Sequence, residues 1–457
     1  MKKLLIAGTT SGSGKTTITL GLLKALSEAH QVQAYKIGPD YVDTKFHTRI
    51  TGRPSRNIDS FLTPDDPTLN YLFTENTQDV DFGIVEGVMG LYDGLGSDKD
   101  AFSTSSIAKK MSLPVILVID AHGISTSAAA LVKGYLDFDP KVNICGVIVN
   151  NVMGASHYEL VKAAIDRYVK IPVLGYLPHN AAVSLPSRQL GLVPDDEVMQ
   201  VDQKISEVAE EMKAHVDISL IEHLARDDQR VIESPVAPKT SSLTVGIAKD
   251  DAFNFYYADN LSLLKQSGIR LVPFSPIKDA HLPDVDVLYF GGGYPEEFAE
   301  QLSKNQSMLK DVRQFSLAGK PIYAECGGLM YLGQHLKVGE ENYEMVGVLD
   351  GDSEMTSRLK RFGYCYAKSL KTNQLAAVNE TVVGHEFHHS VFTVNDGDQL
   401  KPVLKMTKVR DQQVVSEWTG GFQVRNTFAS YLHIHFYQNK TLFNRLVTQW
   451  EAAIHAD

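Results

Sequence analysis

MKKLLIAGTTSGSGKTT, residues 1–17, decides the fold of the first half of the chain. Its apolar run at 4–8 is typical of a buried strand, and the apolar spacing of ITLGLLKALSEAH, residues 18–30, is typical of a helix. Small residues form the turn between them. In this order, backbone N–H groups and the helix N-terminus face an anion, and the small residues let it come close. The stretch therefore predicts a phosphate-binding loop.

The residue types in this loop suit a nucleotide. Lys15 is expected to reach the terminal phosphates, and Thr16 is expected to ligate Mg²⁺. Five residues separate Gly8 from Gly14, one more than in the usual loop, and this spacing resembles that of the dethiobiotin synthetase group. ATP and Mg²⁺ are the expected cofactors. The predicted nucleotide-binding residues are Gly8, Thr10, Gly12, Gly14, Lys15, Thr16 and Thr17.

Short apolar runs alternate with helix-like stretches along residues 1–225, as in FGIVEG, PVILVID and ICGVIVN. This alternation predicts a largely parallel sheet covered by helices on both faces. Residues 226–242, RDDQRVIESPVAPKTSS, lose the periodicity and are predicted to be a linker. Strand-like and helix-like runs resume at LTVGIAKD. The sequence therefore predicts two α/β domains, over 1–225 and 243–457.

Acidic residues follow the predicted strands of the first domain. Asp40 and Asp43 lie in YKIGPDYVD, Glu86 follows FGIV, and Asp93 comes shortly afterwards. Carboxylates at the carboxyl edge of a parallel sheet can hold Mg²⁺ or position an acid substrate beside ATP. We expect these four residues in a synthetase site, with Thr16, Asp43 and Glu86 as metal ligands. Loop acids that only end strands would give the same pattern.

The composition is that of a globular protein, with 43% hydrophobic and 22% charged residues. A formal net charge of -11, without any run of Lys and Arg, argues against nucleic acid as a partner. No apolar stretch approaches the roughly 18 residues that suggest a membrane span. We therefore expect no membrane partner and a cytoplasmic location, while an oligomer stays open.

Only one of the three cysteines lies in a setting that suggests chemistry. Cys145 and Cys365 lie in strand-like runs and are expected to pack as small hydrophobic residues. Cys326 stands between KPIYAE, a predicted strand, and GGLMYLGQHL, a predicted helix. A sharp turn there would project the thiol, and the helix N-terminus would favour the thiolate. Cys326 is therefore a candidate nucleophile for the side-chain amide of glutamine, releasing ammonia.

Two further stretches complete a candidate glutaminase. GGGYP follows the apolar run VDVLYF, so the backbone N–H groups of Gly292 and Gly293, with that of Gly327, are candidates for an oxyanion hole. His433 and His435 lie two apart in ASYLHIHFYQN, which has the pattern of a strand, so both are expected on one face. One of them would serve as the general base.

Motifs along the whole chain resemble those of the cobyrinic acid a,c-diamide synthase family. The matching stretches are GTTSGSGKTT, YKIGPDYVD, VEGVMGLYDG, LPSRQLGL, FNFYYADNL, FGGGYPEEF, AECGGLMYL, GHEFHHS and ASYLHIHF. The resemblance implies an α/β fold with a dethiobiotin synthetase-like P-loop domain followed by a class I glutamine amidotransferase domain. It implies ATP-dependent amidation of the a and c carboxylates of cobyrinic acid through an acyl phosphate, with glutamine or ammonia as nitrogen donor.

By the family pattern, Cys326 is the nucleophile and His433 is the base. Many class I glutaminases carry Glu two residues after that histidine, where this chain has His435, so the third catalytic residue is not assigned. LPSRQLGL has Gln189 where His is expected, which leaves that position without a role. The histidines of GHEFHHS are expected to be structural; they are His385, His388 and His389.

Two alternatives stay open. The same chemistry on hydrogenobyrinic acid or nickel sirohydrochlorin would use the same motifs. A P-loop switch ATPase joined to an inactive glutaminase-like module would explain the first half of the chain but leave Cys326 and His433 without a role. Glutamine-dependent release of ammonia would separate this class from a synthetase.

Overall fold

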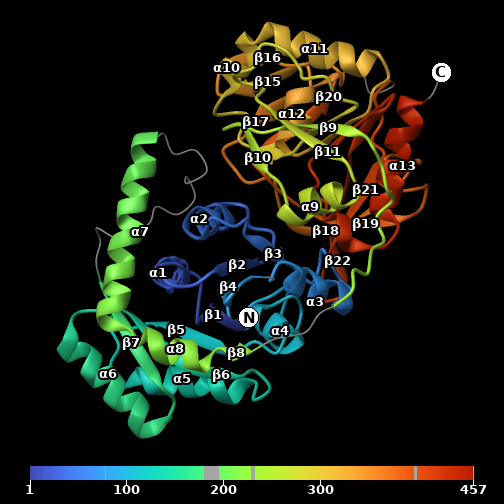
Figure 1. The fold of residues 1–457 in the computed structure, drawn as a ribbon. Helices are drawn as coiled ribbons and strands as arrows, with labels where there is room; N and C mark the ends of the chain where they lie inside the picture. The colour runs from blue at the N-terminus through green and yellow to red at the C-terminus, as the bar shows by residue number, and fades with distance from the viewer. Residues whose placement is uncertain (78, 180–194, 228–231, 396–398, 456–457) are drawn as a thin grey trace. The chain divides into compact units, whose positions relative to one another are not determined.

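The computed structural model describes residues 1–77, 79–179, 195–227, 232–395 and 399–455 (Figure 1). The chain forms two compact units. Met1–Ser60 and Asp66–Glu233 make the first, and Phe61–Asp65 and Ser234–Asp457 make the second. The change from one to the other after Glu233 falls inside the stretch predicted as a linker.

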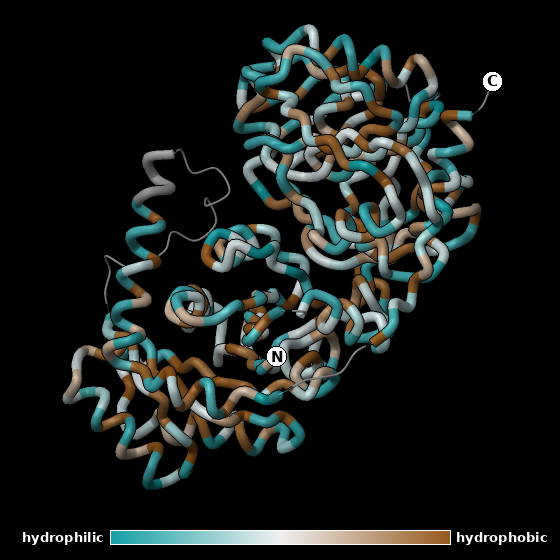
Figure 2. The backbone as a smooth tube through the Cα atoms, viewed as in Figure 1, coloured by the Kyte–Doolittle hydropathy of each residue, from teal (hydrophilic) through white to brown (hydrophobic). Residues whose placement is uncertain are grey.

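The first unit is built on a parallel sheet in the order β3-β2-β4-β1-β5-β6-β7, with β8 pairing antiparallel to β1. The strands are rich in branched apolar residues, as is usual where both faces of a sheet are covered. In Figure 2 the chain through β5 and β6 is largely brown, the colour of hydrophobic residues. The strands are β1 (Lys2–Gly8), β2 (Val32–Ile37), β3 (Arg56–Ile58), β4 (Phe82–Gly90), β5 (Val115–Asp120), β6 (Ile144–Val152), β7 (Val173–Pro178) and β8 (Arg226–Asp227).

Helices cover both faces of this sheet, as the sequence predicts. Successive side chains of a strand point to opposite faces. Leu4 and Ile6 pack in a core with α1, α7 and α8, whereas Leu5 and Ala7 pack in a second core with α3, α4, α5 and α6. The helices are α1 (Lys15–Ser27), α2 (Val42–Thr51), α3 (Asp66–Glu75), α4 (Thr104–Lys110), α5 (Ser127–Phe138), α6 (Ala155–Tyr168), α7 (Asp195–His215) and α8 (Ile218–Leu224).

The second unit has a central sheet in the order β11-β9-β12-β14-β24-β23, parallel except where β23 pairs with β24. Its strands are β9 (Thr244–Ala248), β11 (Arg270–Phe274), β12 (Val287–Phe290), β14 (Ile322–Glu325), β23 (Phe422–Val424) and β24 (Thr427–Ser430). The helices of this unit are α9 (Ala258–Gln266), α10 (Ala299–Lys304), α11 (Gln306–Leu317), α12 (Gly327–Leu332) and α13 (Leu442–Ile454), with a 3₁₀ turn η2 (Phe436–Gln438).

Three smaller sheets accompany the central one. β10 pairs with β13, a second sheet has the order β16-β15-β17-β20, and a third has the order β19-β18-β21-β22. Their strands are β10 (Phe253–Phe255), β13 (Gly292–Gly293), β15 (His335–Val338), β16 (Glu341–Glu344), β17 (Gly351–Met355), β18 (Arg361–Ser369), β19 (Thr381–His388), β20 (Ser390–Val394), β21 (Leu404–Arg410) and β22 (Gln413–Gly420).

The structure differs from the sequence prediction in two local respects. Arg226–Asp227, predicted as linker, adds the two-residue strand β8 to the first sheet. ASYLHIHF is not a continuous strand, because β24 ends at Ser430 and His433 makes only an isolated bridge with His385. The expectation that His433 and His435 share one strand face is therefore wrong.

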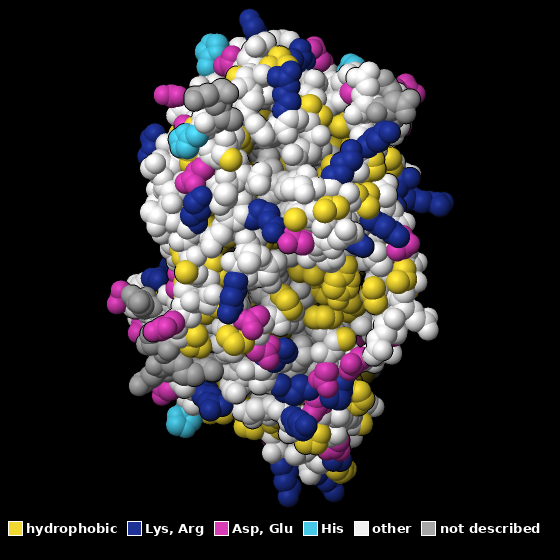
Figure 3. Space-filling model, turned by 90° about the vertical axis from the view of Figure 1, so that its right-hand side faces the viewer, with side chains coloured by type: hydrophobic (Ala, Val, Ile, Leu, Met, Phe, Trp, Pro, Cys, Tyr) yellow, Lys and Arg dark blue, Asp and Glu magenta, His cyan; other side chains and the backbone are white. Residues whose placement is uncertain are grey.

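In the described part of the chain, no helix has both the length and the apolar character that crossing a membrane requires. On the face drawn in Figure 3, Lys and Arg side chains are interspersed with Asp and Glu.

Candidate active sites

The predicted phosphate loop leads from β1 into α1 and is shaped by its glycines. Gly14 has a φ of 93° immediately before the helix, a backbone conformation that residues other than glycine rarely adopt. A Cβ on Gly8 would lie 2.1 Å from Oγ of Ser13 and would also meet the stem of Lys15. Only small residues therefore allow this tight turn.

Lys15 lies within the loop it is predicted to serve. Its side chain is buried, and its ammonium donates to the carbonyl of Thr10 at 3.3 Å. Burial lowers the pKa of Lys15 from its ordinary value, and the nearby Lys36 lowers it further. An anion placed in the loop would offset both effects. Thr17 follows in the first turn of α1 and is half-buried.

Asn150, near the end of β6, supports the predicted phosphate loop. Its amide donates to the carbonyl of Ser13 at 3.1 Å, and a Cβ on Gly14 would lie 1.9 Å from its nitrogen. Asn151 donates to Asp120 at 3.1 Å. The end of β6 thus supports the predicted phosphate loop.

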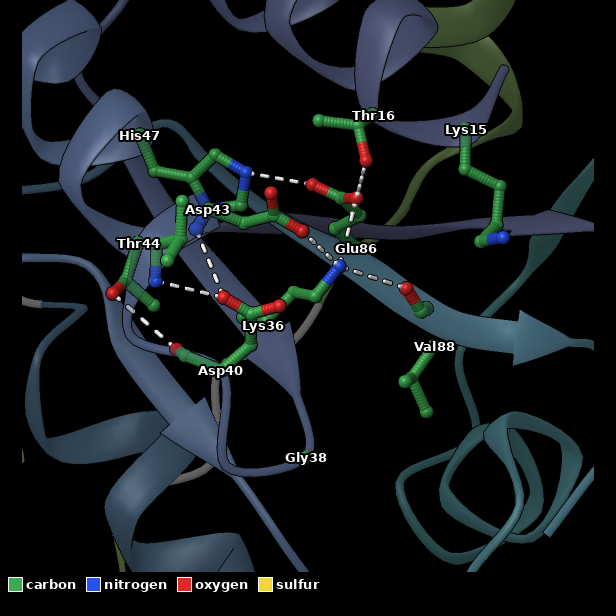
Figure 4. Close-up of polar contacts among 12 residues, drawn as sticks. Lys15, Thr16, Lys36, Gly38, Asp40, Asp43, Thr44, His47, Glu86 and Val88 are labelled. Carbon is green, nitrogen blue, oxygen red and sulfur yellow. Dashed lines mark hydrogen bonds and ion pairs between the residues drawn. The ribbon is translucent and has the colours of Figure 1, made fainter. Parts of the chain in front are cut away.

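Glu86, at the end of the buried part of β4, is the centre of a polar cluster (Figure 4). Its carboxylate is fully buried and accepts from the hydroxyl of Thr16 at 2.7 Å, from the ammonium of Lys36 at 2.8 Å and from Nε2 of His47 at 2.8 Å. Burial alone would raise the pKa of Glu86, but Lys36 and His47 outweigh it and hold that pKa below its ordinary value. Glu86 is therefore an anion in this site.

Lys36 connects Glu86 to a second acid. Its ammonium lies 2.6 Å from Oδ2 of Asp43, so one cation stands between two carboxylates. Burial and the charge of Glu86 raise the pKa of Asp43 to about 6 in spite of Lys36. Lys36 is buried, so these two carboxylates rather than solvent balance its charge.

Asp40 and Asp93 lie outside this network of side-chain contacts. One carboxylate oxygen of Asp40 accepts from the backbone N–H groups of Val42 and Asp43, at 2.8 and 2.9 Å, where α2 begins. The carboxylate of Asp93 accepts from the N–H of Gly90 at 3.0 Å. Both carboxylates fix the backbone beside the cluster.

The donor set for Mg²⁺ fits in part. The Thr16 hydroxyl and the Glu86 carboxylate offer hard oxygen atoms 2.7 Å apart, and Mg²⁺ commonly binds one or two such groups together with phosphates and water. Asp43 is not assembled with them, because the ammonium of Lys36 lies between it and Glu86. Within the described residues, no group of three His, Cys, Asp or Glu side chains is arranged to hold a metal.

Replacing Asp43 by Asn is expected to stabilise the fold at neutral pH. The folded-state pKa, about 6, lies above the ordinary 3.8, so ionised Asp43 costs stability, and this cost grows as the pH rises from about 4 to about 6. Thermal unfolding should show a gain on the order of 1–3 kcal/mol at pH 7 that vanishes near pH 4. Asp137→Asn, at an exposed acid of α5, is the control. A melting temperature below that of the wild type for Asp43→Asn at pH 7 would contradict the expectation that ionised Asp43 destabilises the fold.

Cys326 lies at the sharp turn between β14 and α12. Its φ of 49° and ψ of -102° are strained for a residue with a side chain, as in a nucleophile elbow. Its N–H donates to the carbonyl of Ser430 at 2.7 Å, so β24 supports the turn. Burial, with the charges of Glu296 and Glu386, raises the pKa of the Cys326 thiol, and the N–H of Gly327 opposes this. The free site therefore holds a protonated thiol that needs a base.

The glycines of GGGYP pack directly against this turn. A Cβ on Gly292 would lie 2.5 Å from Cε1 of His433 and 3.4 Å from Cβ of Cys326. A Cβ on Gly327 would lie 3.3 Å from the backbone nitrogen of Gly293. The three oxyanion candidates and His433 are thus brought together around Cys326, from segments far apart in the sequence.

The two histidines of YLHIH have different surroundings. His433 is buried, and its Nδ1 lies 3.6 Å from Oε2 of Glu325. His435 instead lies against the ring of Tyr257, with its Nε2 4.0 Å from Oδ2 of Asp259. Of the two, only His433 adjoins Gly292 beside the elbow.

Sequence reasoning missed two residues that the structure brings into these sites. His47 lies one helical turn after Asp43 on α2, and this spacing could have indicated a shared face. Glu325 ends a strand whose four residues are all buried, and a buried acid next to the nucleophile was a signal. Gln189 lies outside the described residues.

The histidines of GHEFHHS have structural contacts. The ring of His385 stacks on that of His433 with centroids 4.8 Å apart, and its Nδ1 lies 3.2 Å from the hydroxyl of Tyr257. The ring of His388 stacks on Tyr431 at 3.7 Å. The backbone carbonyl of His389 accepts from the N–H of Thr356 at 2.7 Å. His385 thus fixes the ring beside the elbow.

Family models match both halves of the chain. Residues 4–193 match a CobQ/CobB/MinD/ParA nucleotide binding domain, and residues 244–441 match a CobB/CobQ-like glutamine amidotransferase domain. With the fold and the two clusters described above, these matches define the class: a glutamine amidotransferase with a nucleotide-binding domain.

The chain belongs to the cobyrinate a,c-diamide synthase family. It is 64% identical over 444 residues to the cobyrinate a,c-diamide synthase of Limosilactobacillus reuteri, covering 97% of each chain. It is 51% identical to that of Streptococcus sanguinis, again covering 97% of each chain. It is 46% identical over 455 residues to that of Salmonella typhimurium, covering 98% of this chain and 97% of the relative.

Proposed function

We propose that this protein amidates the a and c side-chain carboxylates of cobyrinic acid in the cytoplasm, with glutamine as nitrogen donor and ATP with Mg²⁺ as activator. The observation that carries the proposal is the presence, in one chain, of a phosphate loop joined to an acid cluster and a cysteine elbow joined to a histidine. Full-length similarity to proteins named for this reaction supports the choice of substrate.

The first unit would activate the substrate. A carboxylate oxygen of the corrin side chain attacks the terminal phosphorus of ATP, ADP leaves, and an acyl phosphate forms. Ammonia then attacks the acyl carbon, and phosphate leaves as the amide forms. Loop N–H groups and Lys15 would bind the phosphates, because phosphoryl transfer depends mainly on positioning and charge. Thr16 and Glu86 would hold Mg²⁺, which neutralises charge that develops on the phosphates.

The second unit would supply the ammonia. His433 would take the proton of the Cys326 thiol, and the thiolate would attack the side-chain amide carbon of glutamine. The N–H groups of Gly292, Gly293 and Gly327 would stabilise the oxyanion. Ammonia leaves with a proton from His433, and water then releases glutamate from the thioester.

Glu325 would take the third place in this site by orienting His433 through Nδ1. In the wild type, Oε1 of Glu325 accepts from the Tyr323 hydroxyl and from the N–H of Ile434. Glu325→Gln keeps the shape of the side chain and one oxygen that can still accept both hydrogen bonds. We expect the kcat for glutamine hydrolysis to fall about tenfold to a hundredfold with little change in KM. Ammonium-driven synthesis should be unchanged. Equal kcat values in variant and wild type would remove Glu325 from the mechanism.

The alternative substrates are tested by direct comparison. Cobyrinic acid, hydrogenobyrinic acid and nickel sirohydrochlorin are each incubated with the protein, ATP, Mg²⁺ and glutamine. The proposal expects cobyrinic acid to have the highest kcat/KM for amide formation. A higher value for either of the others would make that acid the substrate. Absence of glutamine-dependent ammonia release would favour the switch-ATPase alternative.

A further inference from the structure

A cavity of about 160 Å³ lies in the second unit beside the cysteine elbow. Two of its walls are segments that hold Cys326 in place. Leu329 lines the cavity and donates its N–H to the carbonyl of Cys326 at 3.0 Å, and Tyr431 lines it directly after Ser430, which accepts from the N–H of Cys326. The other walls come mainly from β18, β19, β20 and β22.

The size of this cavity selects a small ligand. One water needs roughly 10–15 Å³ of such volume, so the space corresponds to about 11 to 16 water-sized positions. A space of that size is enough for an amino acid of about ten non-hydrogen atoms, such as glutamine. A corrin ring is several times larger and does not fit.

The cavity is lined by one buried acid. Glu386 on β19 is 3% exposed, and its carboxylate makes two long contacts, 3.5 Å to Nε1 of Trp418 and 3.5 Å to Nε2 of His388. The Nδ1–H of His388 donates to the carbonyl of Ser390 at 2.8 Å, which fixes the ring. A buried carboxylate is costly unless it is paired, so a cationic ligand would find a preformed partner here.

Cations line the same cavity. Arg361 and Lys360 are exposed, and the guanidinium of Arg361 lies over the ring of Trp418 at 4.7 Å from its centroid. Strand register places Arg361 opposite His388 and Gly363 opposite Glu386. Cross-strand partners share a face, and so do residues two apart on one strand, so Glu386 and Arg361 lie on the same face of the sheet. The residue opposite Glu386 is a glycine, which has no side chain to fill the space beside the acid.

We propose that this cavity binds the amino-acid end of glutamine, with Glu386 accepting from the α-ammonium and Arg361, assisted by Lys360, holding the α-carboxylate. The side-chain amide is then left to extend toward Cys326. The assignment rests on the proposed glutaminase function of the second unit. It gives GHEFHHS a role in substrate recognition that sequence reasoning did not find.

The arrangement also links binding to activation of the thiol. Burial and nearby acids, Glu386 among them, raise the pKa of Cys326 in the free site. An ammonium bound to Glu386 would cancel part of that negative field, so the thiol would lose its proton more readily once glutamine is present. The nucleophile would thus form mainly with its substrate in place.

Substrate analogues test the proposal in the full-length protein. Glutaramic acid lacks the α-ammonium of glutamine, and 4-aminobutanamide lacks the α-carboxylate. Ammonia release is measured for all three amides with the wild type, Glu386→Gln and Arg361→Ala. Glu417→Gln is the matched control, because Glu417 is an exposed acid of the same sheet that pairs with Lys405 and does not line the cavity.

Each cavity variant should weaken the binding of one charged group of glutamine only, the α-ammonium for Glu386→Gln and the α-carboxylate for Arg361→Ala. Glu386→Gln is expected to raise the KM for glutamine about tenfold to a hundredfold and to leave that for glutaramic acid unchanged. Arg361→Ala should raise the KM for glutamine and leave that for 4-aminobutanamide unchanged. Glu417→Gln should match the wild type, and ammonium-driven synthesis should persist in all variants.

Two results would separate the possible failures. If Glu386→Gln raises the KM for glutamine and for glutaramic acid equally, or raises neither, Glu386 does not bind the α-ammonium and the proposal is overturned. If the wild type itself releases no ammonia from glutamine, the glutaminase function fails, and the cavity assignment fails with it.

Discussion

Replacing Cys326 by Ala is expected to abolish glutamine-dependent amidation while amidation with added ammonium continues. Cys326 would form the thioester, and no other described thiol lies at the elbow; Cys145 and Cys365 belong to β6 and β18. Loss of a covalent nucleophile commonly costs on the order of 10³-fold or more in rate. Product formation with each nitrogen source, measured side by side, gives the comparison.

Cys145→Ala is the matched control for this change. Cys145 is half-buried in the other unit, where its thiol lies 3.4 Å from the carbonyl of Val115. It should retain both activities. Loss of the ammonium-driven reaction in a folded Cys326→Ala protein would show that the two units do not divide the work as proposed.

Replacing Lys15 by Met is expected to abolish synthesis with either nitrogen source. Met keeps the aliphatic stem that packs beside Gly8 but removes the ammonium that would contact the phosphates. Loss of one such charge from a phosphoryl-transfer site costs about 10³-fold. Steady-state synthesis with ammonium reports this loss without involving the glutaminase.

Lys24→Ala, in the last turn of the same helix, is the control for this variant. It removes a Lys of α1 away from the phosphate loop and should leave synthesis unchanged. Glutamine hydrolysis by Lys15→Met should remain measurable, since that site lies in the other unit. Ammonium-driven synthesis at the wild-type rate would rule out a role for Lys15 in activation.

Local pattern was enough to predict much of the fold. The glycine-rich turn after β1 and the apolar runs of β4, β5 and β6 predicted a parallel sheet covered by helices, because both signals depend on neighbouring residues. Phe61–Asp65 shows where this reasoning stops. These residues belong to the second unit, where the ring of Phe61 stacks on that of Tyr364 at 4.5 Å, a contact between positions about three hundred residues apart that no local pattern encodes.

The residues of the two candidate sites were predictable from local motifs, but their contacts were not. Motifs indicated Lys15, Glu86, Cys326 and His433, because chemistry restricts the residue types that can stand there. The position of the Lys36 ammonium between Glu86 and Asp43 depends on how β2, β4 and α2 pack, and the sequence could not give it. In the same way, Glu325 meets His433 only through the fold of the second unit.

The most direct test of the account is the product formed from cobyrinic acid with ATP, Mg²⁺ and glutamine labelled at its amide nitrogen. The account predicts, by mass spectrometry, a product with two labelled amides, and no product when either ATP or glutamine is left out. Unchanged cobyrinic acid in the complete mixture, with glutamine consumed and the protein folded, would contradict it.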